Sequence, residues 1–214
     1  KEVSAWKDVF MKLQLDRPSE GTFHDVTYTY SPNDCSVADV DGDGEYEIVV
    51  KWQPSAEADN AHGGFTGPTI FDCYKFDGTK LWRIDMGHNI RSGAHYVPFL
   101  FYDFNGDGRA EFIVKTGPGT KDGVGRYVTE VATEAVIRGT DNEKEYLNAG
   151  GQVMYGPEFL TVFDGLTGKS IHTVYYNPNR ACFVGGAPES RTDIWGDDYG
   201  NRSERYLAAV AHLD

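Results

Sequence analysis

Short runs of β-branched and aromatic residues, separated by turns rich in Gly, Asp and Pro, make up most of this sequence. At residues 26–30 such residues alternate, as expected for a strand, whose successive side chains point to opposite faces. Between residues 33 and 86 four runs follow one another, and Asp77 and Gly78 join the last two. Asp-Gly between two such runs is a strong β-hairpin signal. The predicted strands of this first unit cover residues 35–38, 46–52, 69–76 and 81–84.

A second unit, residues 96–176, repeats this order and ends in its own hairpin turn at Asp164 and Gly165. It differs by a long polar insertion, residues 117–157, between its second and third strands. A third unit is expected to begin at residue 205 and to be cut off at 214. The predicted strands of the second unit cover residues 99–102, 112–116, 160–163 and 171–175.

Repeated four-strand units that each end in an Asp-Gly hairpin predict an all-β fold, a β-propeller. Residues 1–32 are then a lead-in segment, and residues 33–214 form a partial propeller with blades at about 33–86, 96–176 and 205–214. Propellers usually close with roughly four to eight blades, so about two and a half blades predict a fragment of a longer protein. A β-sandwich, the alternative, does not require the units to recur in the same order.

Each unit carries an acidic, glycine-containing loop directly before its second strand. Alternate carboxylates of a tight loop converge on one point, and Ca²⁺ prefers such oxygen ligands. A plain turn is the alternative for one loop, but two loops with the same acidic spacing favour metal binding. The predicted calcium ligands are Asp39, Asp41, Asp43 and Glu47 in the first loop, and Asp103, Asn105, Asp107 and Glu111 in the second.

The balance of charge narrows the range of partners. With 33 acidic and 20 basic residues the chain carries a formal charge of −13, which argues against a nucleic-acid partner. An acidic partner would need bridging cations. No apolar run approaches the ~20 residues of a membrane-spanning helix, so no membrane span is predicted. Cys35, Cys73 and Cys182 form no Cys-x-x-Cys signature, and an odd number fits no closed disulfide set.

Several stretches, in the same order, resemble the family 11 rhamnogalacturonan lyases. Two are specific: Asn-Ile-Arg-Ser-Gly-Ala-His-Tyr at 89–96 and Trp-Gly-Asp-Asp-Tyr-Gly-Asn-Arg at 195–202. The acidic loops by themselves are shared with many propellers. The resemblance covers nearly the whole chain, through residues 31–37, 39–52, 74–85, 89–96, 156–165 and 195–202.

This resemblance implies an eight-bladed, calcium-rich propeller that cleaves the rhamnose–galacturonate backbone of rhamnogalacturonan I, a pectin, by β-elimination. It also implies Ca²⁺ as cofactor, this acidic polysaccharide and the remainder of the propeller as partners, and a secreted, periplasmic or cell-surface location. The elimination requires a neutralised uronate carboxylate, a base for the C5 proton and assistance to the leaving oxygen. Calcium, as a Lewis acid, can stabilise the carbanion-like transition state. The alternative is a non-catalytic, calcium-stabilised propeller that binds carbohydrate or protein.

The predicted substrate-binding residues are Asn33, Lys51 and Gln53. Where the family commonly reads Lys-Trp-Asp-Pro, this chain has Gln53, which offers a carbonyl oxygen but no charge. Asn33 pairs with this position in the family pattern. A cleft metal shared between the two is one interpretation, and a turn-capping Asn is the other.

The predicted catalytic residues are Arg91, His95 and Lys115, and the general base can also lie beyond residue 214. A Lys or Arg whose pKa is lowered by nearby cations is a suitable base. Lys51 and Lys115 end equivalent strands, either as cleft residues or as solvated charges that recur with the repeat. For His95 the alternative is a structural histidine.

Two polar groups have open interpretations. Asp197, Asp198 and Asn201 form either a metal or substrate contact or a plain Asx-turn. His24 and Asp25 look like a metal pair, but adjacent residues in a polar loop are more often solvated.

Overall fold

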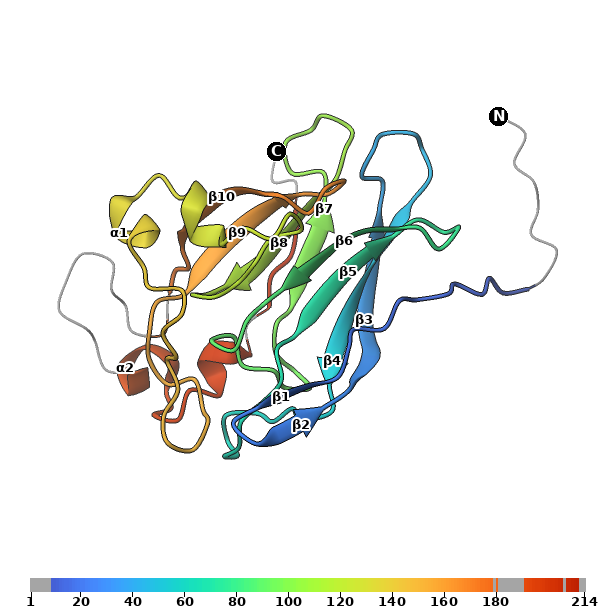
Figure 1. Ribbon diagram of the computed structural model, residues 1–214. Coiled ribbons are helices and arrows are strands. Elements are labelled where there is room, and N and C mark those ends of the chain that lie inside the picture. Colours follow the sequence, from blue (N-terminus) through green and yellow to red (C-terminus); the bar gives the residue numbers. More distant parts are fainter. Residues whose placement is uncertain (1–8, 179, 181–190, 206, 212–214) are drawn as a thin grey trace.

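The computed structural model describes residues 9–178, 180, 191–205 and 207–211 of the 214-residue chain. Most of its regular structure lies in two four-stranded antiparallel sheets that stand next to each other (Figure 1). The described residues are therefore mostly β, in antiparallel four-stranded sheets as expected. A small hairpin lies below the first sheet in this view, and short helices lie beside the second.

The first sheet contains four strands in sequence order, each antiparallel to the next: β3 (Tyr30–Ala38), β4 (Glu47–Pro54), β5 (Ile70–Tyr74) and β6 (Lys80–Asp85). The four runs predicted for this unit all overlap these strands. Nearly every residue of β4 and β5 is buried, while β6 at the edge alternates between buried and more exposed positions. Most residues of these two central strands are apolar or aromatic, and the buried polar residues Lys51 and Asp72 have hydrogen-bond partners inside the protein.

The second sheet repeats this arrangement with β7 (Phe99–Tyr102), β8 (Glu111–Thr116), β9 (Phe159–Asp164) and β10 (Ser170–Tyr175). Each predicted run again overlaps a strand. Consecutive strands pair antiparallel, and a register shift interrupts the β9–β10 pairing. The order of the second sheet along the chain is thus the same as that of the first.

An aromatic core joins the two sheets. The ring of Phe112 on β8 lies 5.0 Å from Phe71 on β5, 5.6 Å from Trp82 on β6 and 5.8 Å from Phe163 on β9, between centroids. Aromatic pairs at such distances stabilise a core by about 0.5–1.5 kcal/mol each beyond the burial of area. The indole N–H of Trp82 also donates to the carbonyl of Gly165 at 2.7 Å, which ties the hairpin of one sheet to the turn of the other.

The described part of the lead-in segment contains regular structure. It contains the hairpin of β1 (Gly21–Phe23) and β2 (Val26–Tyr28), and the strand predicted at 26–30 is divided between β2 and the start of β3. Because β3 already begins at Tyr30, the first sheet starts slightly before the expected boundary at residue 33.

Short helices occur in the connections, not in the sheets. The insertion after β8 contains η1 (Val128–Val131) and α1 (Ala135–Arg138), and the segment after β10 contains α2 (Arg191–Trp195) and η2 (Arg202–Glu204). None of them is longer than about one turn. The insertion expected at 117–157 is therefore an irregular segment that covers one side of the second sheet (Figure 1).

Two sheets do not make a ring, so propeller closure stays a prediction. In the expected third blade, residues 205 and 207–211 form no strand, and 206 and 212–214 lie outside the described residues.

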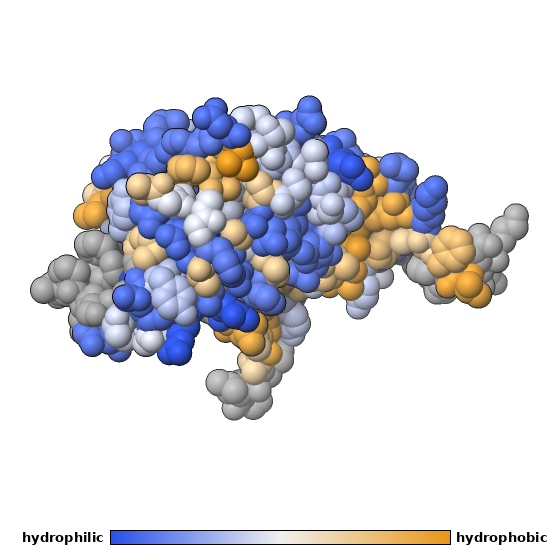
Figure 2. Space-filling view, turned by 90° about the horizontal axis from the view of Figure 1, so that it is seen from below, coloured by the Kyte–Doolittle hydropathy of each residue, from blue (hydrophilic) through white to orange (hydrophobic). Residues whose placement is uncertain are grey.

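Viewed from below, the centre of the molecule is mostly hydrophilic, and apolar side chains gather toward its right edge (Figure 2). Within the described residues, no helix is long and apolar enough to cross a membrane.

Candidate active-site cleft and metal loops

The loop that joins β3 to β4 is folded around the carboxylate of its first residue. Asp39 Oδ1 accepts the backbone N–H of Gly42 (2.7 Å), and its Oδ2 accepts that of Gly44 (2.8 Å). Both glycines have positive φ, 77° and 86°, a conformation that glycine adopts without a steric cost. The N–H of Asp43 donates to Asp41 Oδ1 at 3.2 Å, so the acidic spacing itself builds the turn.

The loop between β7 and β8 has the same hydrogen bonds. Asp103 accepts the N–H of Gly106 (2.7 Å) and of Gly108 (2.8 Å), and Asn105 Oδ1 accepts the N–H of Asp107 (2.9 Å). The two loops lie side by side at the upper end of the sheets (Figure 1), where Ala110 N–H donates to the carbonyl of Asp39 at 2.7 Å.

The last acidic residue of each loop is buried. Glu47 and Glu111 are 2% and 7% exposed, and they accept the N–H of Val40 (3.0 Å) and Phe104 (2.9 Å) respectively. Burial raises the pKa of both carboxyls, and neighbouring acidic residues raise it further. A bound cation would relieve this unfavourable burial of charge.

The donor set of the first loop fits a divalent metal ion. Carboxylate oxygens of Asp39, Asp41 and Asp43 lie within 4.8 Å of one another. Calcium ligands lie 2.3–2.6 Å from the ion, so two of them are at most about 5.2 Å apart. The three carboxylates can therefore surround one ion of that size.

The two loops reduce their internal repulsion differently. In the first, Lys75 Nζ lies 2.7 Å from Asp41 Oδ2 and 3.8 Å from Glu47 Oε1, and it lowers the pKa of Asp41. In the second, Asn105 stands in place of an acid and donates through Nδ2 to Glu111 Oε1 at 2.6 Å. An ion in the first loop would compete with the Lys75 ammonium.

A cavity of about 380 Å³ lies next to the segment that connects β6 to β7. Residues that are distant in sequence form its wall, from the middle of β3 to the segment after η2. It contains His95 and the carboxylate beside the predicted substrate residue Asn33. The residues that line it are Asp34, Ala94, His95, Tyr96, Pro98, Arg205 and Leu207.

Lys51 approaches this cavity from inside the protein. Its Nζ donates to the carbonyl of Tyr96 (2.7 Å) and to Asp34 Oδ2 (3.3 Å). Lys51 is 2% exposed, so its ammonium is not a solvated surface charge. Burial lowers the pKa of Lys51, and the Asp34 carboxylate partly offsets this.

Asn33 and Gln53 are in direct contact, as the family pattern suggested. The amide of Asn33 donates to Gln53 Oε1, and Asn33 Oδ1 accepts the N–H of Asp34 at 2.6 Å. Asn33 therefore both caps the turn, through the N–H of Asp34, and pairs with Gln53. A metal shared between these two oxygens would replace the present amide–amide hydrogen bond.

His95 is exposed at the cleft: its side chain is 60% exposed, and Nδ1 lies 3.4 Å from Asp59 Oδ2. Behind it, Asn60 N–H donates to the hydroxyl of Tyr96 at 2.7 Å. Asp59 Oδ1 and Asn60 Oδ1 are buried without a hydrogen-bond partner among the described residues. Both residues belong to the loop between β4 and β5.

Arg91 is buried, and the partners of its guanidinium among the described residues are all backbone carbonyls. It donates to the carbonyls of Ala58 (2.7 Å), His62 (3.1 Å), Gly64 (2.5 Å) and Gly151 (2.7 Å). This arrangement joins the β4–β5 loop to the insertion after β8. Its geometry suits a residue that positions the loops around the cleft.

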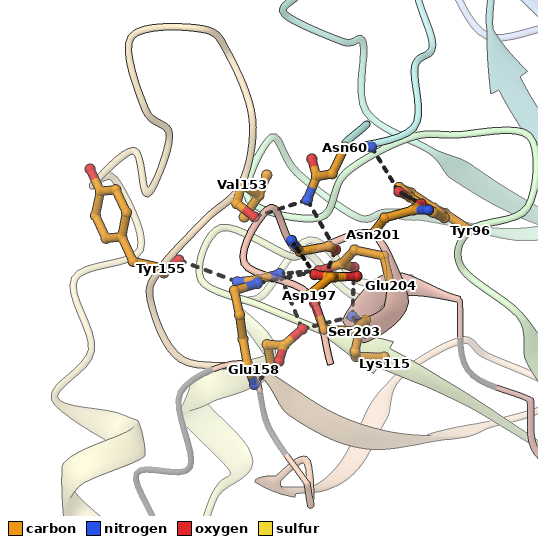
Figure 3. Close-up of polar contacts among 12 residues, drawn as sticks. Asn60, Tyr96, Lys115, Val153, Tyr155, Glu158, Asp197, Asn201, Ser203 and Glu204 are labelled. Atoms are coloured by element: carbon orange, nitrogen blue, oxygen red, sulfur yellow. Dashed lines mark hydrogen bonds and ion pairs between the residues drawn. The ribbon is translucent and has the colours of Figure 1, made fainter. Parts of the chain in front are cut away.

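Lys115 lies in a buried ionic cluster (Figure 3). Its Nζ is 2.7 Å from Glu158 Oε1 and 2.6 Å from Glu204 Oε2, and Arg180 lies 2.6 Å from Glu204 and 3.1 Å from Glu158. All four side chains are 1% exposed. Burial alone would raise the pKa of Glu204, but the two cations lower it to about 2. The Glu204 carboxyl therefore remains ionised at neutral pH.

Sequence reasoning missed Glu158, Arg180 and Glu204. They come from three separate segments, so no local spacing could have indicated that they meet. Asp197 accepts the N–H of Gly200 and Arg202, both at 2.8 Å, which favours the Asx-turn interpretation of that segment.

Comparison with known proteins identifies the family. Residues 10–214 match the family described as rhamnogalacturonan lyase family 11, C-terminal domain. The chain belongs to rhamnogalacturonan lyase family 11. It is 45% identical over 215 residues to rhamnogalacturonan exolyase YesX and 47% identical over 214 residues to rhamnogalacturonan endolyase YesW, both of Bacillus subtilis strain 168. Each alignment covers 100% of this chain but only 32% and 31% of the relative.

Solved structures of family 11 lyases agree with the fold. The YesW crystal structure matches 94% of this chain with a TM-score of 0.80 at 46% identity, and 31% of YesW is covered. The Bacillus licheniformis rhamnogalacturonan lyase matches 88% of the chain with a TM-score of 0.76 at 48% identity, and 29% of it is covered. The chain thus spans about a third of the length of these family 11 relatives.

Proposed function

We propose that the protein to which this chain belongs is a calcium-dependent lyase that cleaves the rhamnose–galacturonate backbone of rhamnogalacturonan I by β-elimination. The observation that carries the proposal is membership of lyase family 11 over residues 10–214. Because the chain spans about a third of its relatives, the remaining catalytic groups come from the rest of the protein.

The cleft around Asn33, Asp34 and His95 is the proposed substrate site. Asn33 and Gln53 offer amide donors and carbonyl oxygens to sugar hydroxyls or to a calcium ion between them. Lys51 places a positive charge behind Asp34, and His95 is the predicted catalytic residue whose side chain reaches solvent. Arg91 and Lys115, whose polar groups are held by internal partners, support the loops on either side.

Calcium has two proposed roles. In the two acidic loops it is structural, because it would neutralise buried Glu47 and Glu111 and fix the turns between strands. At the cleft, a bound calcium ion would supply positive charge for the uronate carboxylate. The cofactor, the secreted, periplasmic or cell-surface location and a closed propeller with further blades follow from the family resemblance and are part of this proposal.

The experiment that tests the lyase follows absorbance of the new C4–C5 double bond when the full-length protein acts on rhamnogalacturonan I. We expect the signal to rise with calcium and to stop in excess chelator. His95→Ala should lower the rate, whereas His172→Ala, on the exposed edge of β10, should not. Absence of double-bond formation at every calcium concentration would refute the catalytic proposal.

The second candidate is a non-catalytic propeller that binds the polysaccharide. Gln53 favours it, because the cleft lacks the carboxylate that the family commonly has at this position. Retained binding to rhamnogalacturonan I without product would support this alternative. Restoration of cleavage by Gln53→Asp would show that the charge at this position decides between the two.

A further inference from the structure

A second cavity, of about 260 Å³, lies away from the cleft. One wall is the segment that follows β6, and the other is the insertion after β8. It shares none of its lining residues with the cavity beside His95. Its lining includes Asp85, Asn89, Lys121, Tyr127, Glu143 and Lys144.

The two walls are held together by direct hydrogen bonds. The backbones of Asp85 and Lys121 exchange two N–H···O bonds of 2.8 and 3.1 Å. Asn89, which is 7% exposed, donates to the carbonyls of Pro118 and Lys144, both at 2.9 Å. This second cavity, called the groove from here on, therefore has walls that are held at a fixed separation by backbone hydrogen bonds and by the buried amide of Asn89.

Two lysines of the groove contact aromatic rings. Lys121 Nζ lies 5.1 Å from the ring centroid of Tyr127, and Lys144 Nζ lies 5.0 Å from that of Tyr146. Both lysines are exposed, and no ion pair with a described residue is formed by either. Such cation–π contacts hold an ammonium in place without neutralising its charge.

The carboxylates of the groove are engaged by other groups. Glu145 Oε2 is 2.7 Å from His24 Nε2, and Glu143 accepts the hydroxyl of Tyr127. Asp85 Oδ1 accepts a backbone N–H at 2.9 Å. The groove of this acidic protein thus combines two cations that lack a carboxylate partner with a tyrosine ring on its wall.

We propose that this groove binds a hexuronate unit of an acidic polysaccharide, at a distance from the bond that is cleaved. Lys121 and Lys144 would bind the carboxylate, Tyr127 would contact the sugar ring, and Asn142 and Glu143 would bind hydroxyls. A volume below the roughly 300–1,000 Å³ of typical ligand pockets suits one sugar ring. The inference goes beyond the proposed function, because it concerns binding and not cleavage.

The test measures affinity of the full-length protein for rhamnogalacturonan I by electrophoresis in gels that contain the polymer. Replacing both lysines in K121Q/K144Q should weaken binding roughly tenfold, because two charge-assisted contacts are lost. The matched control is K12Q/K169Q, which removes two exposed lysines elsewhere and changes net charge equally. The control should bind like the unmodified protein, and binding should weaken as salt is added.

Four results separate this inference from the proposed lyase. Equal affinity of K121Q/K144Q and the control would overturn it, and so would equally tight binding of a neutral galactan. A fragment of the polymer too short to reach from the cleft to the groove should be cleaved at the same rate by all three proteins. If no cleavage occurs but K121Q/K144Q still binds more weakly than the control, the groove is supported and the lyase is not.

Discussion

Replacing Lys115 by Met should destabilise the protein far more than the same change at Lys51, although the two lysines occupy equivalent places in the two sheets. Lys115→Met keeps a long side chain, so it leaves little cavity, but it leaves Glu158 and Glu204 with one cation, Arg180. Removing one partner from a buried ion cluster costs about 3–5 kcal/mol, since the remaining charge is uncompensated.

Lys51→Met is the matched control. Its carboxylate partner, Asp34, is 65% exposed and can be solvated by water when the ammonium is lost. The remaining cost comes from the carbonyl of Tyr96, which loses the Lys51 ammonium as its donor. A buried acceptor left without a partner costs about 1–3 kcal/mol. The structure therefore predicts that Lys115→Met lowers the free energy of unfolding more than Lys51→Met does.

The free energy of unfolding of each variant, from urea denaturation of the full-length protein, checks this order. A further variant, K115M/E204Q, restores charge balance in the cluster and should recover part of the loss. Two results would contradict this reasoning. One is a loss of unfolding free energy in Lys115→Met that is no larger than the loss in Lys51→Met. The other is a loss in K115M/E204Q equal to the sum of the losses in Lys115→Met and Glu204→Gln, because the two residues would then not be coupled.

Three other predictions concern the loops and pH. Replacing Asp43 or Asp107 by Ala should lower the melting temperature in calcium and reduce the difference between calcium and chelator, because each change disables one of the two loops; a melt unaffected by calcium in the unmodified protein would contradict this. Lys75→Met should strengthen calcium binding, measured by calorimetry, because it removes the ammonium that competes at Asp41; unchanged affinity would show that this contact does not oppose the ion. Because the pKa of Glu204 is lowered to about 2, its stabilisation is present above its ordinary pKa and is lost as pH falls from about 5 toward 2. Urea denaturation between pH 6 and 3 should therefore show less acid destabilisation in Glu204→Gln, and an identical pH dependence would count against this ionisation.

The sequence by itself determined the strands, their order and the acidic loops. These features depend on local rules: side chains alternate along a strand, Asp-Gly forms hairpins, and a tight acidic loop needs glycines at fixed places. Because both units obey the same local rules, the loops of Asp39 and Asp103 fold with nearly identical hydrogen bonds. The resemblance of residues 89–96 and 195–202 was also sufficient to predict the family that the comparison identified.

Only the tertiary structure decided what the side chains at equivalent positions do. Lys51 and Lys115 follow the same pattern along the chain, yet one contacts exposed Asp34 and the other a buried cluster with Glu204. The difference arises because the second unit is covered by η2 and its flanking residues, which fold back from far along the chain. Burial and the charge of distant neighbours determine whether a lysine is accessible to a substrate, and neither can be obtained from the spacing of residues in one strand.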